Sequence, residues 1–227
     1  MIDTRGGGKR SKALSAKSLM SMLAKNSIEL NLIDYELTDL SILDVVLPRM
    51  SDVLFVNFSS NSLENIDWLN KLHQLKKIGA TNNYIRYINL SLGHLQELDL
   101  RNNFIEKFPP LDQLPMLRTL ILKANSISSF RLKLASLNYQ NLRKIDVRNN
   151  KIRMNQEQIS RFADKLKKFQ QLRLLNMEEN QGIELDGHSD AYIKLIKSLP
   201  KSLEMFNNQR KIYLLREVQD ELLKRKK

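Results

Sequence analysis

Few residues of this sequence have types and spacing suited to catalysis. There is no cysteine, and the histidine separations fit no metal-ligand pattern; the histidines are His73, His94 and His188. No G-x-S-x-G or H-E-x-x-H segment occurs. Gly8-Lys9 matches part of a phosphate-binding loop, but Arg10 stands where that loop needs Ser or Thr. The sequence therefore predicts a non-enzymatic protein without a cofactor or metal.

Acidic side chains offer a second possible chemistry, since paired carboxylates can act as acid and base. Asp99, Asp146 and Glu178 fall at outward positions of a repeated pattern, so they are expected on one face of the fold. Basic residues share that face, namely Arg101, Lys144 and Arg148. We interpret this mixture as ion pairs.

The pattern that positions these residues is an internal repeat. Its frame is apolar, two variable, apolar, one variable, apolar, two variable, Asn, one variable, apolar. Copies begin at Val53, Leu75, Leu95, Leu117, Leu142 and Leu172. The frame places asparagine at Asn61, Asn83, Asn103, Asn125, Asn150 and Asn180, with Tyr35 at the matching place of a partial first copy.

Each copy predicts one short strand and one turn. Period-2 alternation sends the leucines inward and the residues between them onto an exposed face. The buried asparagines can satisfy backbone groups at the turns, forming an asparagine ladder. The expected fold is an α/β solenoid with a curved parallel β-sheet on the concave face, helices and turns on the convex face, and a cap at each end.

Both caps and one inserted helix have sequence signals. An amphipathic segment at 17–26 can cover the first strand. Asn155 followed by Gln158 is typical of a helix start, and apolar residues then recur on one helical face, at Ile159, Phe162, Ala163, Leu166 and Phe169. This insert accounts for the 30-residue step between Asn150 and Asn180.

The copies from Val53 to Ile152 resemble the leucine-rich-repeat family, in particular its phosphatase-regulator-like class. The segment AYIKLIKSLPKSLEMFNNQ from Ala191 is similar to the carboxyl cap of the spliceosomal A-prime protein and of the axonemal dynein light chain of repeat type. Tyr192, Leu199, Pro200 and Leu203 fit that cap, whereas Phe206-Asn207 stands where Leu-Asp is usual. The openings LNLIDYEL and VNFSSNSLENIDWL look like the A-prime protein as well as ciliary repeat proteins, although the inserted helix departs from the A-prime pattern.

The frame also lists the residues expected on the concave face. Charges of both signs alternate there with isolated apolar residues, which fits a protein ligand better than a nucleic acid. The candidate protein-binding residues are Phe55, Asn57, Lys77, Glu97, Asp99, Arg101, Ile121, Lys123, Asp146, Arg148, Leu174 and Asn176. The alternative for any charged residue of this set is that it is only a solvated position on the sheet surface and takes no part in binding.

The net charge of +12 is concentrated at the ends. Residues 1–25 carry +5 and residues 208–227 carry +4, so the 182 residues between them hold +3. We expect a flexible basic arm at 1–17, the repeat domain with its caps at 18–207, and a basic amphipathic helix at 208–227. Either end could contact an acidic protein surface or RNA. The final helix, with Ile212, Leu215, Val218 and Leu222 near one side, either docks onto a partner or packs along the repeats.

These expectations lead to a functional hypothesis. The lack of cysteine favours an intracellular location, and no segment has the roughly 20 apolar residues of a membrane span. We expect an adaptor or structural subunit of a hetero-complex, in a ciliary or other microtubule-based assembly in the cytoplasm. The alternative is a nuclear A-prime-like subunit that binds an RNA-binding protein, and a phosphatase regulator is a third class.

Overall fold

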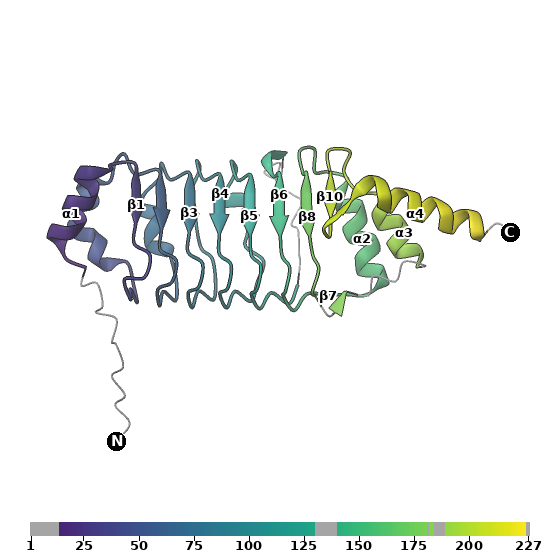
Figure 1. Cartoon of the computed structure of the whole chain (residues 1–227), viewed down its shortest axis with the longest axis horizontal. Helices are drawn as coiled ribbons and strands as arrows, with labels where there is room; N and C mark the ends of the chain where they lie inside the picture. Colours follow the sequence, from purple (N-terminus) through teal and green to yellow (C-terminus); the bar gives the residue numbers. More distant parts are fainter. Residues whose placement is uncertain (1–13, 130–139, 181, 184–188, 226–227) are drawn as a thin grey trace, which may run out of the picture.

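The computed structural model describes residues 14–129, 140–180, 182–183 and 189–225. The chain forms an elongated stack of repeats, with the first and the last described helices at opposite ends of the stack (Figure 1). Most of the arm expected at 1–17 lies outside the described residues. Helix α1 (Ala16–Lys25) takes in the last two residues assigned to that arm, so the cap begins earlier than expected.

Within the described ranges, nine strands form one sheet in the order β1-β2-β3-β4-β5-β6-β8-β10-β11. The strands are β1 (Glu29–Asn31), β2 (Phe55–Asn57), β3 (Lys77–Gly79), β4 (Glu97–Asp99), β5 (Thr119–Ile121), β6 (Lys144–Asp146), β8 (Leu174–Asn176), β10 (Met205–Phe206) and β11 (Gln209–Arg210). Neighbours from β1 to β10 pair in parallel, each strand with the next copy of the frame. The prediction of a parallel-sheet solenoid is confirmed.

Alternation explains how so short a strand can be stable. The middle residue of each repeat strand is buried, as Leu30, Val56 and Ile78 show in the first three. These side chains join the leucines that flank each strand in one continuous core. The residues on either side of the middle one point to the opposite side and form the exposed face of the sheet.

The other side of the stack carries turns and helices. The early repeats have short 3-10 segments there: η1 (Ser41–Val45), η2 (Leu47–Arg49), η3 (Asp67–Lys71) and η4 (Leu111–Gln113). The longer repeat carries α2 (Gln156–Leu166), which packs on α3 (Asp190–Lys197). Asn155 caps α2 in a reciprocal box with Gln158, and the apolar residues expected on its inner face are buried from Ile159 to Leu166. Phe169, expected on the same face, is buried as well but lies beyond the end of the helix. A separate pair, β7 (Arg153–Met154) and β9 (Gly182–Ile183), lies beside the insert.

The frame asparagines lie buried between repeats and hydrogen-bond to both. Asn103 accepts from the backbone N–H of Ile85 in the preceding repeat and donates to the carbonyls of Ala80 and Leu100. Asn61, Asn83, Asn125, Asn150 and Asn180 make the same kinds of bond. In the partial first copy, Tyr35 holds the place of the asparagine, and its backbone N–H donates to the side chain of Asn61 in the next copy.

The residue before each of these asparagines adopts a left-handed backbone conformation. Its φ lies between 50° and 57° at Ser60, Asn82, Asn102, Ala124, Asn149 and Glu179. Asparagine tolerates this region better than other non-glycine residues, which explains the Asn-Asn pairs of three repeats. Ala124 and Glu179 have no such advantage and are held there by the surrounding stack.

The ends of the stack are closed differently. Helix α1 packs on β1 and η1 at the first end, with Leu19 and Leu23 buried. At the other end, the chain turns back after β10 through Asn207 and Asn208, both with positive φ, and β11 pairs antiparallel with β10. A two-residue turn with positive φ at both positions is the usual connection of a tight hairpin.

Helix α4 (Lys211–Lys224) follows the hairpin and packs against α3 (Figure 1). Its buried residues are Leu214 and Val218. Ile212 and Leu215, which were expected on the same side as Val218, are exposed instead. The single apolar side expected for this helix is therefore corrected to two, one buried against α3 and one open.

Candidate binding face

The candidate site is the exposed face of the sheet, here called the sheet face. It consists of the first and third residues of each strand and the residue two positions after the strand. Parallel register places equivalent residues side by side, so that Phe55 lies between Glu29 and Lys77, and Ile121 lies between Asp99 and Asp146. The repeats thus bring together residues that are 20 or more positions apart in the sequence.

The third residue of a strand has a structural task wherever it is Asn or Asp. Its side-chain oxygen then accepts the backbone N–H two residues later, which closes an Asx turn at the end of the strand. This bond measures 3.0 Å at Asn57, 3.3 Å at Asp99, 3.2 Å at Asp146 and 3.1 Å at Asn176. The recurrence of Asn or Asp at one place in the frame was the sequence signal for this role.

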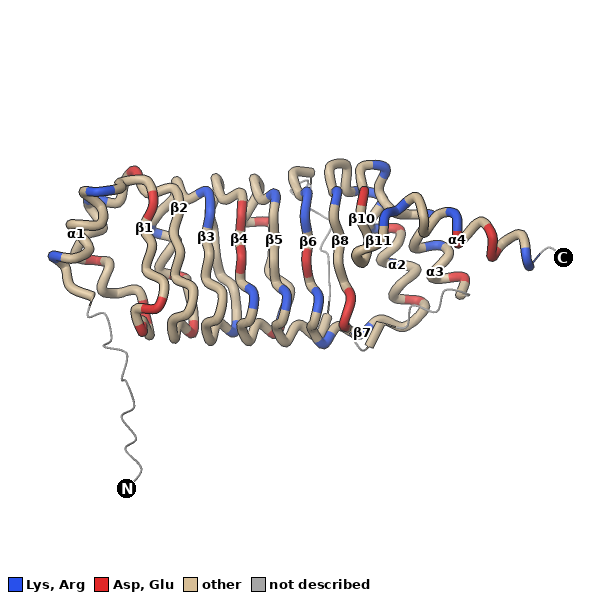
Figure 2. The backbone as a smooth tube through the Cα atoms, viewed as in Figure 1, with Lys and Arg blue, Asp and Glu red and all other residues tan. Residues whose placement is uncertain are grey.

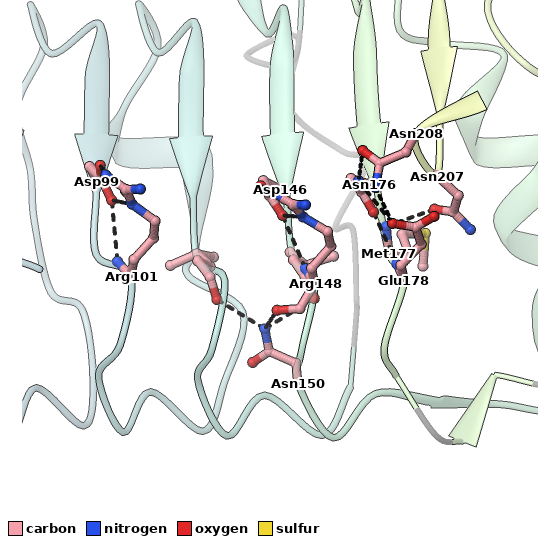
Figure 3. A network of polar contacts seen from close by, with 12 residues as sticks. Asp99, Arg101, Asp146, Arg148, Asn150, Asn176, Met177, Glu178, Asn207 and Asn208 are labelled. Carbon is pink, nitrogen blue, oxygen red and sulfur yellow. Dashed lines mark hydrogen bonds and ion pairs between the residues drawn. The ribbon is translucent and has the colours of Figure 1, made fainter. Parts of the chain in front are cut away.

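Two of these turns carry a bidentate ion pair (Figure 3). Arg101 folds back on Asp99, with 2.7 Å between Nη2 and Oδ2 and 3.0 Å between Nε and Oδ1. Arg148 holds Asp146 at the same two distances. The hydrogen bonds to Asp99 raise the pKa of the Arg101 guanidinium above its ordinary value, and those to Asp146 do the same for Arg148. The expected ion pairing is confirmed for Asp99 with Arg101 and for Asp146 with Arg148.

Burial changes the part that two candidate residues can play. Asp146 and Asn176 are only 3% and 2% exposed, because neighbouring strands and their own hydrogen-bond partners cover them. The expectation that they offer contact area to a partner is not met. Asp146 positions the side chain of Arg148, and Asn176 positions the polar groups beside β8. A partner could reach those groups, but not Asp146 or Asn176 themselves.

A polar network closes the last part of the sheet face (Figure 3). The Asn176 amide donates to Asn208 Oδ1 at 2.8 Å, and Asn208 donates in turn to Glu178. Asn207 Oδ1 accepts the backbone N–H of Met177 at 2.8 Å, in the place where the next repeat would supply a carbonyl. The hairpin asparagines therefore complete hydrogen bonds that the sheet would otherwise leave open.

The apolar candidates on the sheet face are partly covered. Phe55, Ile121 and Leu174 are each half-buried, and Leu174 lies beside Met205 of β10. Ile121 stands between the two aspartate–arginine pairs, because its register partners are Asp99 and Asp146. This places one apolar side chain between two ordered guanidinium groups.

Charge on the sheet face is mixed across the stack (Figure 2). Lys77 and Glu97 pair across neighbouring strands at 2.9 Å, with both side chains about half exposed. Arg101, Lys123 and Arg148 occupy the same place in three consecutive repeats. The carbonyls of Lys123 and Arg148 accept the backbone N–H groups of Asn102 and Ala124 in the repeat before each. The three basic residues form a row that ends at Glu178 in the following repeat.

Groups suited to metal binding do not gather in the part of the chain that the structure describes. No cluster of three or more His, Asp or Glu side chains there could hold a metal ion. His73 and His94 are exposed in the segments before their strands, and His188 lies outside the described residues.

The frame also overlooked exposed aromatic residues at the turns. Tyr84 and Phe104 each follow a ladder asparagine and stack with ring centroids 5.7 Å apart and ring planes within 2°. Both are about half exposed, and Tyr87 lies nearby in the sequence with similar exposure. The repeated Asn-aromatic pair was the available signal, but it concerns an edge of the solenoid and not the sheet face.

Comparisons of sequence and of structure give different amounts of information. No protein-family model matches the sequence, and the search of curated proteins finds no significant match. Solved structures do match: the functional domain of InlJ from Listeria monocytogenes, TLR13 in a complex with ssRNA13, and LRIM1 or APL1C in their complex. All three belong to leucine-rich-repeat proteins.

The structural similarity is broad, while the sequence similarity is low. The TM-scores are 0.55 for InlJ, 0.60 for TLR13 and 0.52 for the LRIM1/APL1C chain, with identities of 19%, 16% and 23%. The matches cover 81%, 85% and 73% of this chain, but only 35%, 30% and 33% of the other chains. These matches show that the chain has a leucine-rich-repeat fold.

Among the described residues, no helix is both long and apolar enough to cross a membrane. The longest is α4, which has 14 residues and carries charges along its length.

Proposed function

We propose that this protein is a non-enzymatic adaptor whose sheet face binds a segment of another protein. The observation that carries the proposal is the placement of Ile121 between the Asp99–Arg101 and Asp146–Arg148 pairs. An apolar anchor flanked by ordered arginines is the composition found at energetically important parts of protein interfaces. The rigid stack orders these groups before binding, which reduces the entropy lost in a complex.

The arginine pairs favour a ligand with carboxylates. A guanidinium has five N–H donors, so an aspartate that engages Nε and Nη2 leaves donors for a second acceptor. Lys123 adds a further positive charge between Arg101 and Arg148. The ligand that fits best has an apolar side chain for Ile121 and acidic side chains on both sides of it.

We further propose a place for the adaptor in a large intracellular assembly, first a ciliary or other microtubule-based one. The support is the resemblance of its opening repeats and carboxyl cap to ciliary repeat proteins and to the axonemal dynein light chain. An A-prime-like spliceosomal subunit is the second candidate, supported by LNLIDYEL from Leu30 and VNFSSNSLENIDWL from Val56. The α2 insert favours the first candidate, because it departs from the A-prime pattern.

The test is affinity purification of the tagged full chain from its own cells, followed by mass spectrometry. Axonemal proteins or tubulin among the partners would support the first candidate, and splicing proteins the second. Recovery of neither group would overturn both. Ile121→Asp and Phe55→Asp should each remove the specific partners, because a charge there faces the ligand's apolar side chain.

Tyr87→Asp is the matched control, since it places the same charge on an exposed aromatic away from the sheet face. It should leave the partner list unchanged. Equal recovery of partners by all three variants would show that binding does not use the sheet face. Thermal unfolding of each variant distinguishes a lost contact from a lost fold.

A further inference from the structure

The carboxyl end of the stack contains an open groove of about 690 Å³ between the β10–β11 hairpin and α4. Its apolar lining includes Met205, Ile212 and Leu215. Leu203 lies at its base and is buried. The groove is separate from the pairs around Ile121, because it is built by the cap and not by the repeats.

The groove leaves apolar side chains of α4 without cover in the structure. Ile212 is 55% exposed and Leu215 is 37% exposed, whereas Leu214 and Val218 on the other side are 3% exposed each. Packing on α3 therefore accounts for one stripe of α4 and leaves the second stripe open. Together with Met205, Ile212 and Leu215 give the groove an apolar wall that a partner side chain could cover.

The rim of the groove is basic. Lys201 and Arg210 are exposed, and both line it. The acidic residue of the lining, Glu204, faces Arg173 at 3.8 Å, which partly compensates its charge. Lys211 is turned to the end of α3, where its Nζ donates to the carbonyls of Leu199 and Pro200, and burial lowers its pKa. Blue segments mark this basic region beside β11 in Figure 2.

We propose that this groove binds an amphipathic helix of a partner protein, with its apolar stripe on Ile212 and Leu215 and acidic side chains facing Lys201 and Arg210. A helix suits the site because Ile212 and Leu215 are three residues apart, one helical turn, so that a ridge on a partner helix can pack between them. A β-strand ligand suits it less, because β11 has only two residues to pair with.

Charge also separates this ligand from a second copy of the chain. A symmetric dimer through the groove would bring the basic rims of both copies, with Lys201 and Arg210 of each, into one interface. Like charges within one interface oppose association. An acidic partner makes the same contact favourable.

The experiment is selection of a phage-displayed library of 16-residue peptides on the full chain, with removal of peptides that also bind an Ile212→Ser/Leu215→Ser variant. The peptides enriched should carry net negative charge, with apolar residues at helical spacing. One enriched peptide, labelled with fluorescein, should then lose at least tenfold in affinity for the double variant and for Lys201→Glu/Arg210→Glu. Enrichment of basic or unpatterned peptides, or no enrichment, would overturn the proposal.

Leu223→Ser is the matched control, since Leu223 is 54% exposed on the same helix but does not line the groove. It should change the affinity by less than twofold. Phe55→Asp should also have no effect, so the result is independent of the proposed function of the sheet face. Two other results would overturn the proposal. One is self-association in sedimentation, and the other is binding to phosphatidylserine vesicles, provided that the Ile212→Ser/Leu215→Ser variant loses it.

Discussion

The side-chain oxygen of Asn103 accepts a hydrogen bond from the backbone N–H of Ile85, 18 residues earlier, at 3.0 Å. Through this bond and its donations to Ala80 and Leu100, one amide connects two turns of the chain. The same arrangement recurs along the stack.

Asn103→Leu should lower the free energy of unfolding by about 2 kcal/mol or more, because it removes the hydrogen-bond partner of two buried backbone groups, the N–H of Ile85 and the carbonyl of Ala80, at roughly 1–3 kcal/mol each. The carbonyl of Leu100 keeps its bond from Asn125. Asn65→Leu, an equal change at an exposed position, should cost less than about 0.5 kcal/mol. Urea unfolding of both variants measures the difference. Similar losses in the two would show that the ladder bonds contribute little.

Ala124→Gly should stabilise the protein by about 1 kcal/mol. Ala124 has a φ of 56°, a region that costs a residue with Cβ about 1–2 kcal/mol and glycine almost nothing. Ala163→Gly, inside helix α2, should instead destabilise by about 1 kcal/mol or more. Opposite shifts of the two urea midpoints are expected, and a lower midpoint for Ala124→Gly would contradict the argument.

Asp146→Ala should destabilise by about 2 kcal/mol, since it removes a buried acceptor from both the backbone N–H and the guanidinium of Arg148. Asp146→Asn should lose less, because an amide oxygen can still accept the backbone bond. Glu97→Ala breaks an exposed pair with Lys77 and should change stability by less than about 0.5 kcal/mol. If Asp146→Ala lowers stability no more than Glu97→Ala does, the Asp146–Arg148 pair does not stabilise the fold.

Two substitutions of Asn207 should separate the two roles of its side chain in the hairpin. Asn207→Ala loses the bond to Met177 and also places alanine at a φ of 47°, so we expect a loss of about 2 kcal/mol. Asn207→Gly loses the bond alone and should cost about 1 kcal/mol. Equal losses in thermal unfolding would mean that backbone conformation has no part in the effect.

The repeat frame predicted most of the fold because each copy has the same pattern of apolar residues and asparagine, and that pattern allows only one local structure. Alternating apolar residues at Leu98 or Ile145 require a strand with one buried side, and an asparagine at a fixed distance from them requires a turn with a buried amide. Helix α2 was equally readable, since Asn155 and Gln158 form a local capping box that needs no distant partner. Such signals lie within a few residues of one another.

Features that depend on packing between distant parts of the chain could not be predicted from the sequence. The sequence of α4 contains two apolar stripes of similar spacing, and only the position of α3 decides that Leu214 is buried while Ile212 is open. Likewise, nothing local distinguishes Asp146 from Asp99, although the first is buried and the second is partly exposed. The difference arises from the strands that happen to lie beside each.

The antiparallel strand β11 has a consequence for assembly. A sheet built from parallel repeats offers an open edge at its last strand, where another molecule could add its own first strand and continue the stack into a filament. Because β11 reverses direction, that edge no longer matches the parallel register, and α1 covers β1 at the other end. The hairpin thus ends the parallel stacking of strands and opposes end-to-end polymerisation.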